Sequence, residues 1–473
     1  MKTEFRIEKD LIGTKEVPKD AYYGIQTLRA VENFPITGIT PHVEMIRALA
    51  AVKKAAALAN MEVGVLKKKI GEAIAQASDE VLDGKFYDQF IVDSIQGGAG
   101  TSMNMNANEV IANRAVELLG GEKGEYLHCS PNTHVNMAQS TNDVFPTAIR
   151  IASLNLAGGV IEQLDKLRQA LREKATEFDQ VIKMGRTHLQ DAVPIRLGQE
   201  FAAYARVISR DHDRVLRSLE NLREINMGAT AVGTGLNADP RYIVKVAEHL
   251  RAITGLDLKR AEDLVDATQN TDAYTEVSSA LKICAVNLSK MCNDIRLMAS
   301  GPRTGLGELN LPARQPGSSI MPGKVNPVMA EVVNQVAFQI IGNDHTISLA
   351  SEAGQLELNV MEPVLVFNLL QSLSILQNVL VVFRERLIDG LTANIERCRE
   401  LVEKSVGVVT AINPHVGYET ATLVAKEAIQ TGRSVREICL ERGILTEEEL
   451  DVILNPFEMT SPGIAGSKLL FGE

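Results

Sequence analysis

Tryptophan is absent from this chain of 473 residues, and aromatic residues make up only 4% of it. Hydrophobic residues nevertheless account for 45%, so sizeable cores can be built mainly from Leu, Ile, Val and Ala. Basic residues are also in deficit, with 49 Lys and Arg against 60 Asp and Glu and a net charge of −11. This balance argues against nucleic acid and acidic membranes as partners, although a cleft on an acidic protein can still attract a small anion.

Cysteine is scarce and lacks metal-binding spacing. The five cysteines are odd in number and scattered, which favours reduced, buried thiols over disulfides or zinc ligands (Cys129, Cys284, Cys292, Cys398 and Cys439). The opening segment 1–10 alternates charges and lacks the apolar core of a signal peptide, and no later apolar run approaches the ~18 residues of a membrane span. We therefore expect a cytoplasmic protein with no membrane partner, no metal and no cofactor.

Proline is missing from long stretches of the chain, which predicts long helices there. The gaps run from Pro146 to Pro194, from Pro194 to Pro240, from Pro240 to Pro302 and from Pro363 to Pro414. In the first gap, apolar residues recur at intervals of seven, at Ala157, Leu164, Leu171 and Phe178. Such spacing places them along one seam of a helix, as packed bundles require.

Two further segments, about 271–300 and about 363–387, are apolar on more than one side of the expected helix. Such helices need burial on more than one side, which predicts an all-α fold with a multi-helix bundle that spans several subunits. Core packing within a single chain is the alternative explanation of the same pattern. Shorter, Gly- and Pro-punctuated segments flank the long helices, so we expect three helical domains at 1–141, 142–397 and 398–473.

The stretch 317–327, Gly-Ser-Ser-Ile-Met-Pro-Gly-Lys-Val-Asn-Pro, superficially resembles a phosphate-binding loop. Five residues, not four, separate Gly317 from Gly323, and Val325 stands where the magnesium-binding hydroxyl would be. Two prolines also break the preceding segment, which therefore cannot be the buried strand of such a loop. A nucleotide site is rejected on these grounds.

Four loop-like segments concentrate hydroxyl and amide side chains: 97–104, 139–143, 185–191 and 317–327. Helix capping alone explains such composition in each segment, and a lone histidine such as His188 is more often structural. Taken together, the segments supply many hydrogen-bond donors, a lysine and a histidine, but no paired carboxylates and no metal-ligand cluster. This balance suits a substrate that is itself a small dicarboxylate.

The stretch 317–327 also resembles the signature loop of the aspartase/fumarase superfamily, homotetrameric lyases that eliminate across a C–C bond to release fumarate. The resemblance extends over essentially the whole chain and includes the other three segments. Within the superfamily the sequence is most similar to the aspartate ammonia-lyases, at residues 6–13, 20–24, 226–231 and 326–328. Fumarases typically carry Gly-Gly-Thr and Thr-Gln at the last two places. Ala330 departs from the pattern, because aspartases usually have proline there.

The resemblance implies the reversible deamination of L-aspartate to fumarate through an enediolate. It assigns Ser318 as general base, with His188 and Lys324 also catalytic, and it implies substrate binding by Thr101, Ser140, Thr141, Asn142, Thr187, Ser319 and Asn326. Each site would be assembled from three subunits of the tetramer. Fumarate hydratase or another superfamily lyase is the alternative function, and a non-catalytic structural homologue is a more distant one.

Overall fold

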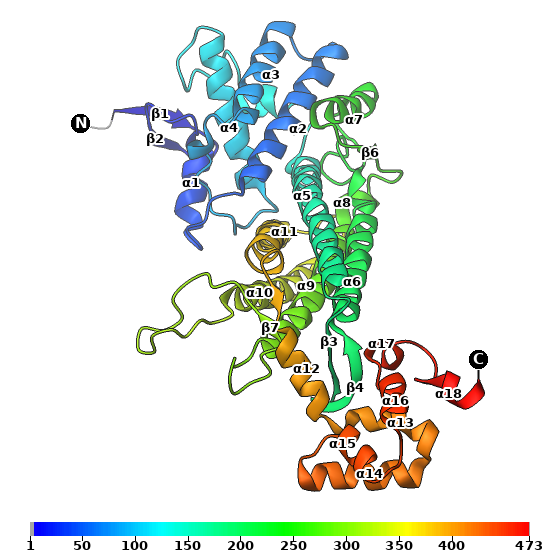
Figure 1. Cartoon of the computed structure of the whole chain (residues 1–473). Helices are drawn as coiled ribbons and strands as arrows, with labels where there is room; N and C mark the ends of the chain where they lie inside the picture. The colour runs from blue at the N-terminus through cyan, green and yellow to red at the C-terminus, as the bar shows by residue number, and fades with distance from the viewer. Residues whose placement is uncertain (1–3, 473) are drawn as a thin grey trace. The chain divides into compact units, whose positions relative to one another are not determined.

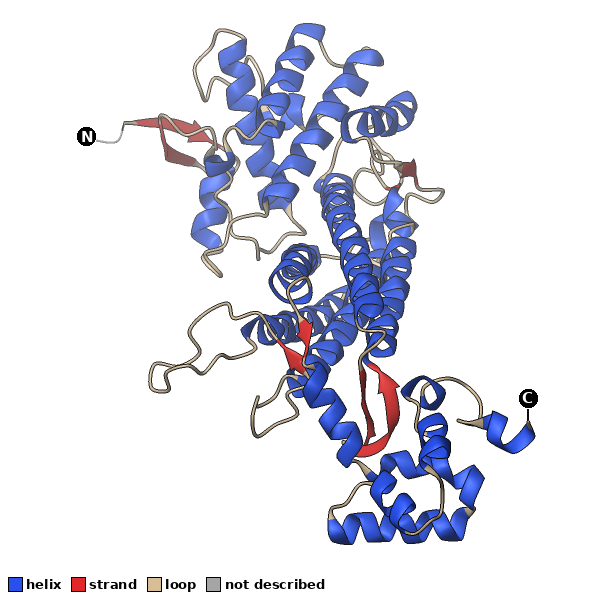
Figure 2. Ribbon diagram, viewed as in Figure 1, coloured by secondary structure: helices blue, strands red, loops and turns tan. Residues whose placement is uncertain are grey.

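The computed structural model of the chain describes residues 4–472, whose regular secondary structure is almost entirely helical (Figure 2). Met1–Thr3 of the charged opening segment and Glu473 lie outside the described residues. The all-α prediction is confirmed, with small strands as the exception. In residues 4–472 the strands form four two-stranded sheets, β1 (Phe5–Lys9) with β2 (Thr14–Pro18), β3 (Ile182–Thr187) with β4 (Gln190–Arg196), β5 (Glu224–Ile225) with β6 (Lys259–Arg260), and β7 (Leu309–Asn310) with β8 (Thr392–Ala393).

The chain divides into two compact units. Unit 1 contains the chain up to Glu162 with residues 211–286 and 336–378, and unit 2 contains residues 163–210, 287–335 and the chain from Val379 onward. The division falls within five long helices, α5 (Thr141–Glu177), α6 (Leu197–Ser218), α9 (Asp272–Met298), α10 (Val328–Glu352) and α11 (Glu362–Phe383). Helices α5, α6, α9 and α11 lie mostly in the predicted proline-poor gaps, although α5 contains Pro146 in its second turn. Helix α10, which follows Pro327, was not among the predicted helices. The division into three domains stays a prediction.

Helix α2 (Val43–Glu62) illustrates how unit 1 is packed. It carries alanine at most of its buried positions, and such small side chains let α3 (Lys68–Leu82) and α7 (Pro240–Thr254) approach closely (Figure 1). The remaining elements of unit 1 are α1 (Ile25–Asn33), η1 (Tyr87–Gln89), α4 (Thr101–Leu118), η2 (Pro131–Val135), η3 (Asn221–Arg223) and α8 (Asp266–Gln269).

Unit 2 combines the β3–β4 hairpin with the C-terminal helices. Met184 of β3 is fully buried in one apolar cluster with Ile412, Val424 and Ile438, so the base of the hairpin is anchored in this core. The remaining helices of unit 2 are η4 (Arg384–Ile388), α12 (Ile395–Lys404), η5 (Val406–Val408), α13 (Val409–Val416), α14 (Tyr418–Thr431), α15 (Val435–Glu441), α16 (Glu447–Ile453), α17 (Pro456–Met459) and α18 (Ser467–Phe471).

Two helical stretches, Thr141–Glu177 and Glu362–Ile388, are long and apolar enough to cross a membrane by length and composition. The expectation that no segment would reach this length was therefore wrong. Small residues and scattered polar ones hide the apolar character from a search for uninterrupted runs. In the most apolar window of each, 72% and 56% of the residues are buried inside the protein, as in core helices of soluble proteins. The five cysteines are free and buried, as predicted.

Candidate active site

The glycine-rich segment 97–100 ends at the start of α4. Gly100 has φ +86°, and a Cβ at this position would lie 2.5 Å from the ring of Phe145, so only glycine fits the turn. Thr101 follows as the first residue of the helix and is exposed. Its Oγ1 donates to the carbonyl oxygen of Gly98 at 2.7 Å. The segment therefore places a hydroxyl at a helix start, where the helix dipole favours an anion.

The segment 140–142 forms the start of α5. The Ser140 hydroxyl accepts from the N–H of Asn142 at 3.2 Å and so caps the helix. Asn104 of α4 donates through Nδ2 to Thr141 Oγ1 at 3.0 Å. Asn142 donates through Nδ2 to the carbonyl oxygen of Ala231 at 2.8 Å. The predicted residues of unit 1 thus stand at two helix starts joined by an Asn–Thr hydrogen bond.

Two buried ionisable side chains, Lys53 and Asp143, lie near these helix starts and influence each other electrostatically. Lys53 is 0% exposed and donates to Asn136 Oδ1 at 3.0 Å and Gln139 Oε1 at 2.8 Å. Asp143 is also 0% exposed. Burial raises the pKa of Asp143 to about 6, against the opposing effect of backbone N–H groups and of Lys53, and burial lowers the pKa of Lys53 to about 7. Each group favours the charged form of the other.

The third predicted segment is the β3–β4 hairpin, and the expectation of a loop at a helix boundary was wrong. His188 and Leu189 form its two-residue turn with φ +56° and +60°, as such turns require. Thr187 and His188 are exposed at the tip. Arg186, just before them, donates to Glu308 Oε1 at 2.7 Å. The hairpin thereby carries its candidate residues on a rigid ribbon.

The base of the hairpin contains a buried ion cluster. Glu308 is 0% exposed, and its Oε2 lies 3.4 Å from Nζ of Lys183, a residue that is itself only 3% exposed. Lys183 also pairs with Glu200 at 3.1 Å. Burial raises the pKa of the Glu200 carboxyl, and Lys183 opposes that effect. Because Glu308 directly precedes β7, the cluster ties the hairpin to the strand that leads into the loop 311–327.

The loop 311–327 connects β7 with α10 and extends away from the helices of its unit (Figure 1). Ser318 Oγ accepts from the N–H groups of Ile320 at 3.2 Å and Met321 at 3.0 Å. Asn326 donates through Nδ2 to the carbonyl oxygen of Gly317 at 2.8 Å and so closes the loop on itself. Ser319 and Lys324 are exposed. The loop brings together all four residues predicted within it.

The close approach across the loop depends on glycine. A Cβ on Gly317 would lie 2.0 Å from the carbonyl oxygen of Lys324, and Gly323 has φ +86°. Both glycines therefore serve the backbone path of the loop, in agreement with the rejection of a phosphate site. Ala330 is fully buried in the first turn of α10, and its N–H donates to the carbonyl oxygen of Pro327 at 3.1 Å.

Sequence reasoning missed the buried charges that support the candidate residues, namely Lys53, Asp143 and Glu308. A weak signal existed for Asp143, because a serine followed three residues later by an acidic residue is the pattern of a capping box. Lys53 lies within an alanine-rich helix, where a lysine that is fully buried cannot be distinguished from one on the surface.

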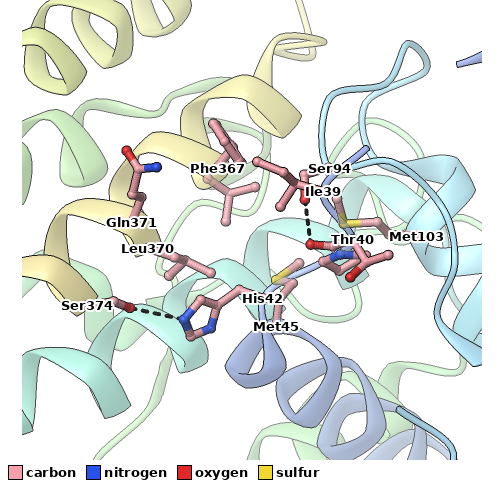
Figure 3. Close-up of a pocket in the computed structure, with 12 residues that line it drawn as sticks. Ile39, Thr40, His42, Met45, Ser94, Met103, Phe367, Leu370, Gln371 and Ser374 are labelled. Carbon is pink, nitrogen blue, oxygen red and sulfur yellow. Dashed lines mark hydrogen bonds between the residues drawn. The ribbon is translucent and has the colours of Figure 1, made fainter. Parts of the chain in front are cut away.

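One cavity lies away from these residues. It has a volume of about 220 Å³ and lies between Thr40, His42 and Met45 on one side and Phe367, Leu370 and Gln371 of α11 on the other (Figure 3). Its walls are mostly apolar, and burial lowers the pKa of its single histidine, His42, which is hydrogen-bonded to Ser374 at 3.0 Å. A neutral, apolar cavity does not attract a dicarboxylate, and none of the predicted site residues lines it.

Comparison with known proteins agrees with this arrangement. A family model described as lyase matches residues 13–342, and one described as the fumarase C C-terminus matches residues 408–461. Aspartate ammonia-lyase of Bacillus subtilis (strain 168) is 67% identical over 99% of this chain and 98% of its own length. Aspartate ammonia-lyase of Escherichia coli (strain K12) is 51% identical over 98% of this chain and 97% of its own length.

Solved structures share the fold. The fumarate lyase:delta crystallin of Brucella melitensis, solved bound to cobalt, is 49% identical and superimposes with a TM-score of 0.94 over 97% of this chain and 100% of that one. The recombinant class II fumarase of Schistosoma mansoni is 36% identical with a TM-score of 0.92 over the same shares of the two chains. In residues 4–472, no group of three or more His, Cys, Asp or Glu side chains is placed to hold a metal ion.

The family model and the full-length relatives show that the chain is a lyase. The chain belongs to the aspartase/fumarase superfamily, and its aspartate ammonia-lyase relatives place it among the carbon–nitrogen lyases. The resemblance on which the sequence prediction rested is thereby confirmed.

Proposed function

We propose that the chain catalyses the reversible deamination of L-aspartate to fumarate and ammonia. Relatives that are 51–67% identical and matched over nearly their full length carry the name aspartate ammonia-lyase, which supports this reaction over others of the superfamily. The observation that carries the mechanism is the Ser318 hydroxyl, which faces two backbone N–H groups of its own loop.

The difficult step is removal of a weakly acidic proton from the carbon beside the side-chain carboxylate. Its electron pair moves into that carboxylate and produces an enediolate with extra negative charge on two oxygens. The charge then returns to form the C=C bond, while the C–N bond breaks and ammonia leaves with its electron pair. Preorganised donors aimed at the two oxygens stabilise the intermediate, and loss of one such donor costs on the order of 10²–10³ in rate.

Thr101, Ser140, Thr141 and Ser319 are the donors proposed for the enediolate carboxylate. Thr101 and the Ser140–Thr141 pair stand at the starts of α4 and α5, where the helix dipole adds positive potential. Short hydroxyl side chains in such places need little reorganisation when charge develops.

Ser318 is proposed as the base that takes the proton. A serine hydroxyl is a poor base unless its alkoxide is stabilised, and the N–H groups of Ile320 and Met321 already donate to this oxygen. Closure of the loop 311–327 over the substrate would exclude water and strengthen these contacts. The proton removed from carbon then resides on Ser318 Oγ until the product leaves.

The remaining residues are proposed to bind the other end of L-aspartate. Lys324 and Asn326 suit its α-carboxylate, since an ammonium and an amide supply charge and directed donors. Asn142, Thr187 and His188 are placed around the amino group and the neighbouring carboxylate, with His188 as a catalytic residue. No metal or cofactor takes part in these steps.

We further propose a cytoplasmic homotetramer whose sites each combine segments from three subunits. Apolar side chains that remain exposed on the long helices, such as Ile283, Val286 and Phe338, support association of several copies. A monomer would then be inactive. The three domains at 1–141, 142–397 and 398–473 remain part of this proposal.

The test is the ultraviolet absorbance of fumarate after the purified protein is added separately to L-aspartate and to L-malate. We expect a rise with L-aspartate alone. A rise with L-malate alone would establish the fumarase activity for which the Schistosoma mansoni structure is a precedent. No rise with either substrate would favour a structural homologue and reject the proposal.

Ser318→Ala tests the mechanism within this assay. We expect turnover to fall by on the order of 10²–10⁴-fold while the tetramer persists in size-exclusion chromatography. Ser461→Ala, at an exposed position in the C-terminal region, is the matched control and should keep full turnover. Robust turnover of the Ser318 variant would remove this residue from the base role.

A further inference from the structure

A buried carboxylate, that of Asp143, helps to tie the start of α5 to the segment 226–231. Asp143 Oδ1 accepts from the N–H of Ser140 at 2.9 Å, and Oδ2 accepts from the N–H groups of Gly228 and Thr230, both at 3.0 Å. The side chain is 0% exposed. Asp143 therefore joins the hydroxyl-bearing helix start to a chain segment more than eighty residues away in sequence.

The segment is shaped to receive an anion. Gly228 has φ +95° and Thr230 has φ +58°, and this backbone path turns their two N–H groups toward one point. A carboxylate can accept hydrogen bonds from the N–H groups of Gly228 and Thr230 with one oxygen and from the N–H of Ser140 with the other. An amide has only one acceptor oxygen, so whichever way it turned it would present an N–H₂ group to one of the two partners.

The same segment fixes the side chain of Asn142. Its Nδ2 donates to the carbonyl oxygen of Ala231 at 2.8 Å, which leaves Oδ1 as the end that can accept a hydrogen bond. Asn226 Nδ2 donates at 3.0 Å to the main-chain carbonyl of Asn142. That carbonyl has no helical partner, because Pro146 lacks the N–H that would reach it. A substrate ammonium group has only donors, so it needs the free Oδ1.

We propose that Asp143 is a positioning residue for the amine half of the reaction. By holding 226–231 against the start of α5, it keeps the Asn142 amide turned so that Oδ1 faces the amino group. The inference rests on the proposed function, in which Asn142 lies beside that group. Asp143 itself touches no substrate, so its removal should impair the handling of ammonia more than the handling of fumarate.

The test measures the addition direction, with fumarate and ammonia varied separately. Asp143→Asn preserves the size of the side chain but loses one of its acceptors. We expect the KM for ammonia to rise about tenfold, the weight of one hydrogen bond, while the KM for fumarate stays within about twofold. A merely structural role would lower stability and the amount of active enzyme without separating the two KM values.

Glu109→Gln is the matched control. Glu109 is 1% exposed and likewise accepts backbone N–H groups, from Gly24 at 2.8 Å, Gln26 at 2.9 Å and Thr27 at 3.1 Å, but it contacts none of the predicted site residues. Its variant should lose stability with both KM values changed alike.

Gly228→Ala perturbs the segment 226–231 without changing Asp143. It tests the inference if Asp143→Asn does not fold. The added Cβ would lie 2.9 Å from Ile243 Cγ2 at a positive φ, which displaces the segment with Asp143 intact. A selective rise in the KM for ammonia in this variant supports the inference. If the wild type deaminates L-aspartate but these variants change both KM values in proportion, or neither, the inference is overturned. If the wild type forms no fumarate from L-aspartate, the proposed function fails first.

Discussion

Glu308→Gln should destabilise the protein more than any exposed charge change. Glu308 is 0% exposed and faces Arg186 at 2.7 Å and Lys183 at 3.4 Å, whose side chains are 13% and 3% exposed. The glutamine keeps the shape but leaves Lys183 paired with Glu200 and Arg186 with only a 3.9 Å contact to the half-exposed Asp191. Loss of one partner from a buried ion cluster costs about 3–5 kcal/mol, because the remaining charge stays desolvated.

The assay is the denaturant midpoint followed by circular dichroism, with the oligomeric state checked at each protein concentration. Glu403→Gln is the control, because its pair with Arg399 has side chains 60% and 73% exposed and should contribute little to stability. The double variant Lys183→Met with Glu308→Gln should recover part of the loss. A cost for Glu308→Gln no larger than that of the control would refute the reasoning.

Three further changes test other parts of the fold. Gly100→Ala should abolish most turnover and lower the melting temperature, because the added Cβ would lie 2.5 Å from the Phe145 ring directly before Thr101. Fumarate formation and thermal denaturation measure the two effects. Burial raises the pKa of Glu362 to about 8, so the native state keeps a proton that the unfolded chain loses above pH 4.5. The stability that protonated Glu362 contributes is therefore fully present below pH 4.5 and is lost as the pH rises through 8. Glu362→Gln should flatten the dependence of the denaturant midpoint on pH between 5 and 9. The five buried cysteines should resist a thiol reagent in the native protein and react together on unfolding.

The long helices could be predicted because proline gaps and apolar spacing are local signals. Helix α9 (Asp272–Met298) and helix α11 (Glu362–Phe383) lie within a few residues of the expected 271–300 and 363–387. The β3–β4 hairpin could not be predicted in this way. Lys183 and Met184 are consecutive and both buried, and a bulge between Met184 and Arg186 shifts the register, so the alternation that marks a strand is lost.

Some residues of the candidate site could be predicted from the sequence, whereas the buried groups that support them could not. Residues such as Ser318 and Lys324 lie in short motifs whose resemblance to a family is visible in the sequence alone. Asp143 and Glu308 have partners such as Gly228 and Arg186 that are far away along the chain, and no local pattern records those contacts. Capping residues were correctly expected at the start of α5, whereas the clamp on 226–231 required the fold.

A common physical arrangement supports both groups of candidate residues. In unit 1, Lys53 and Asp143 lie buried beneath the start of α5, and in unit 2, Lys183 and Glu308 lie buried beneath the hairpin tip. The proposed reaction places extra negative charge on an already anionic substrate, and donors stabilise it well only if they cannot reorient. Surface ion pairs would not hold those donors, since water and salt weaken them. Burying these charges costs desolvation. Lys53, Asp143 and Lys183 offset part of that cost through hydrogen bonds to amide or backbone groups, and Glu308 does so through its ion pairs with Arg186 and Lys183. The candidate residues can therefore be exposed to the substrate while the charged groups that hold their helix starts and hairpin in place are buried.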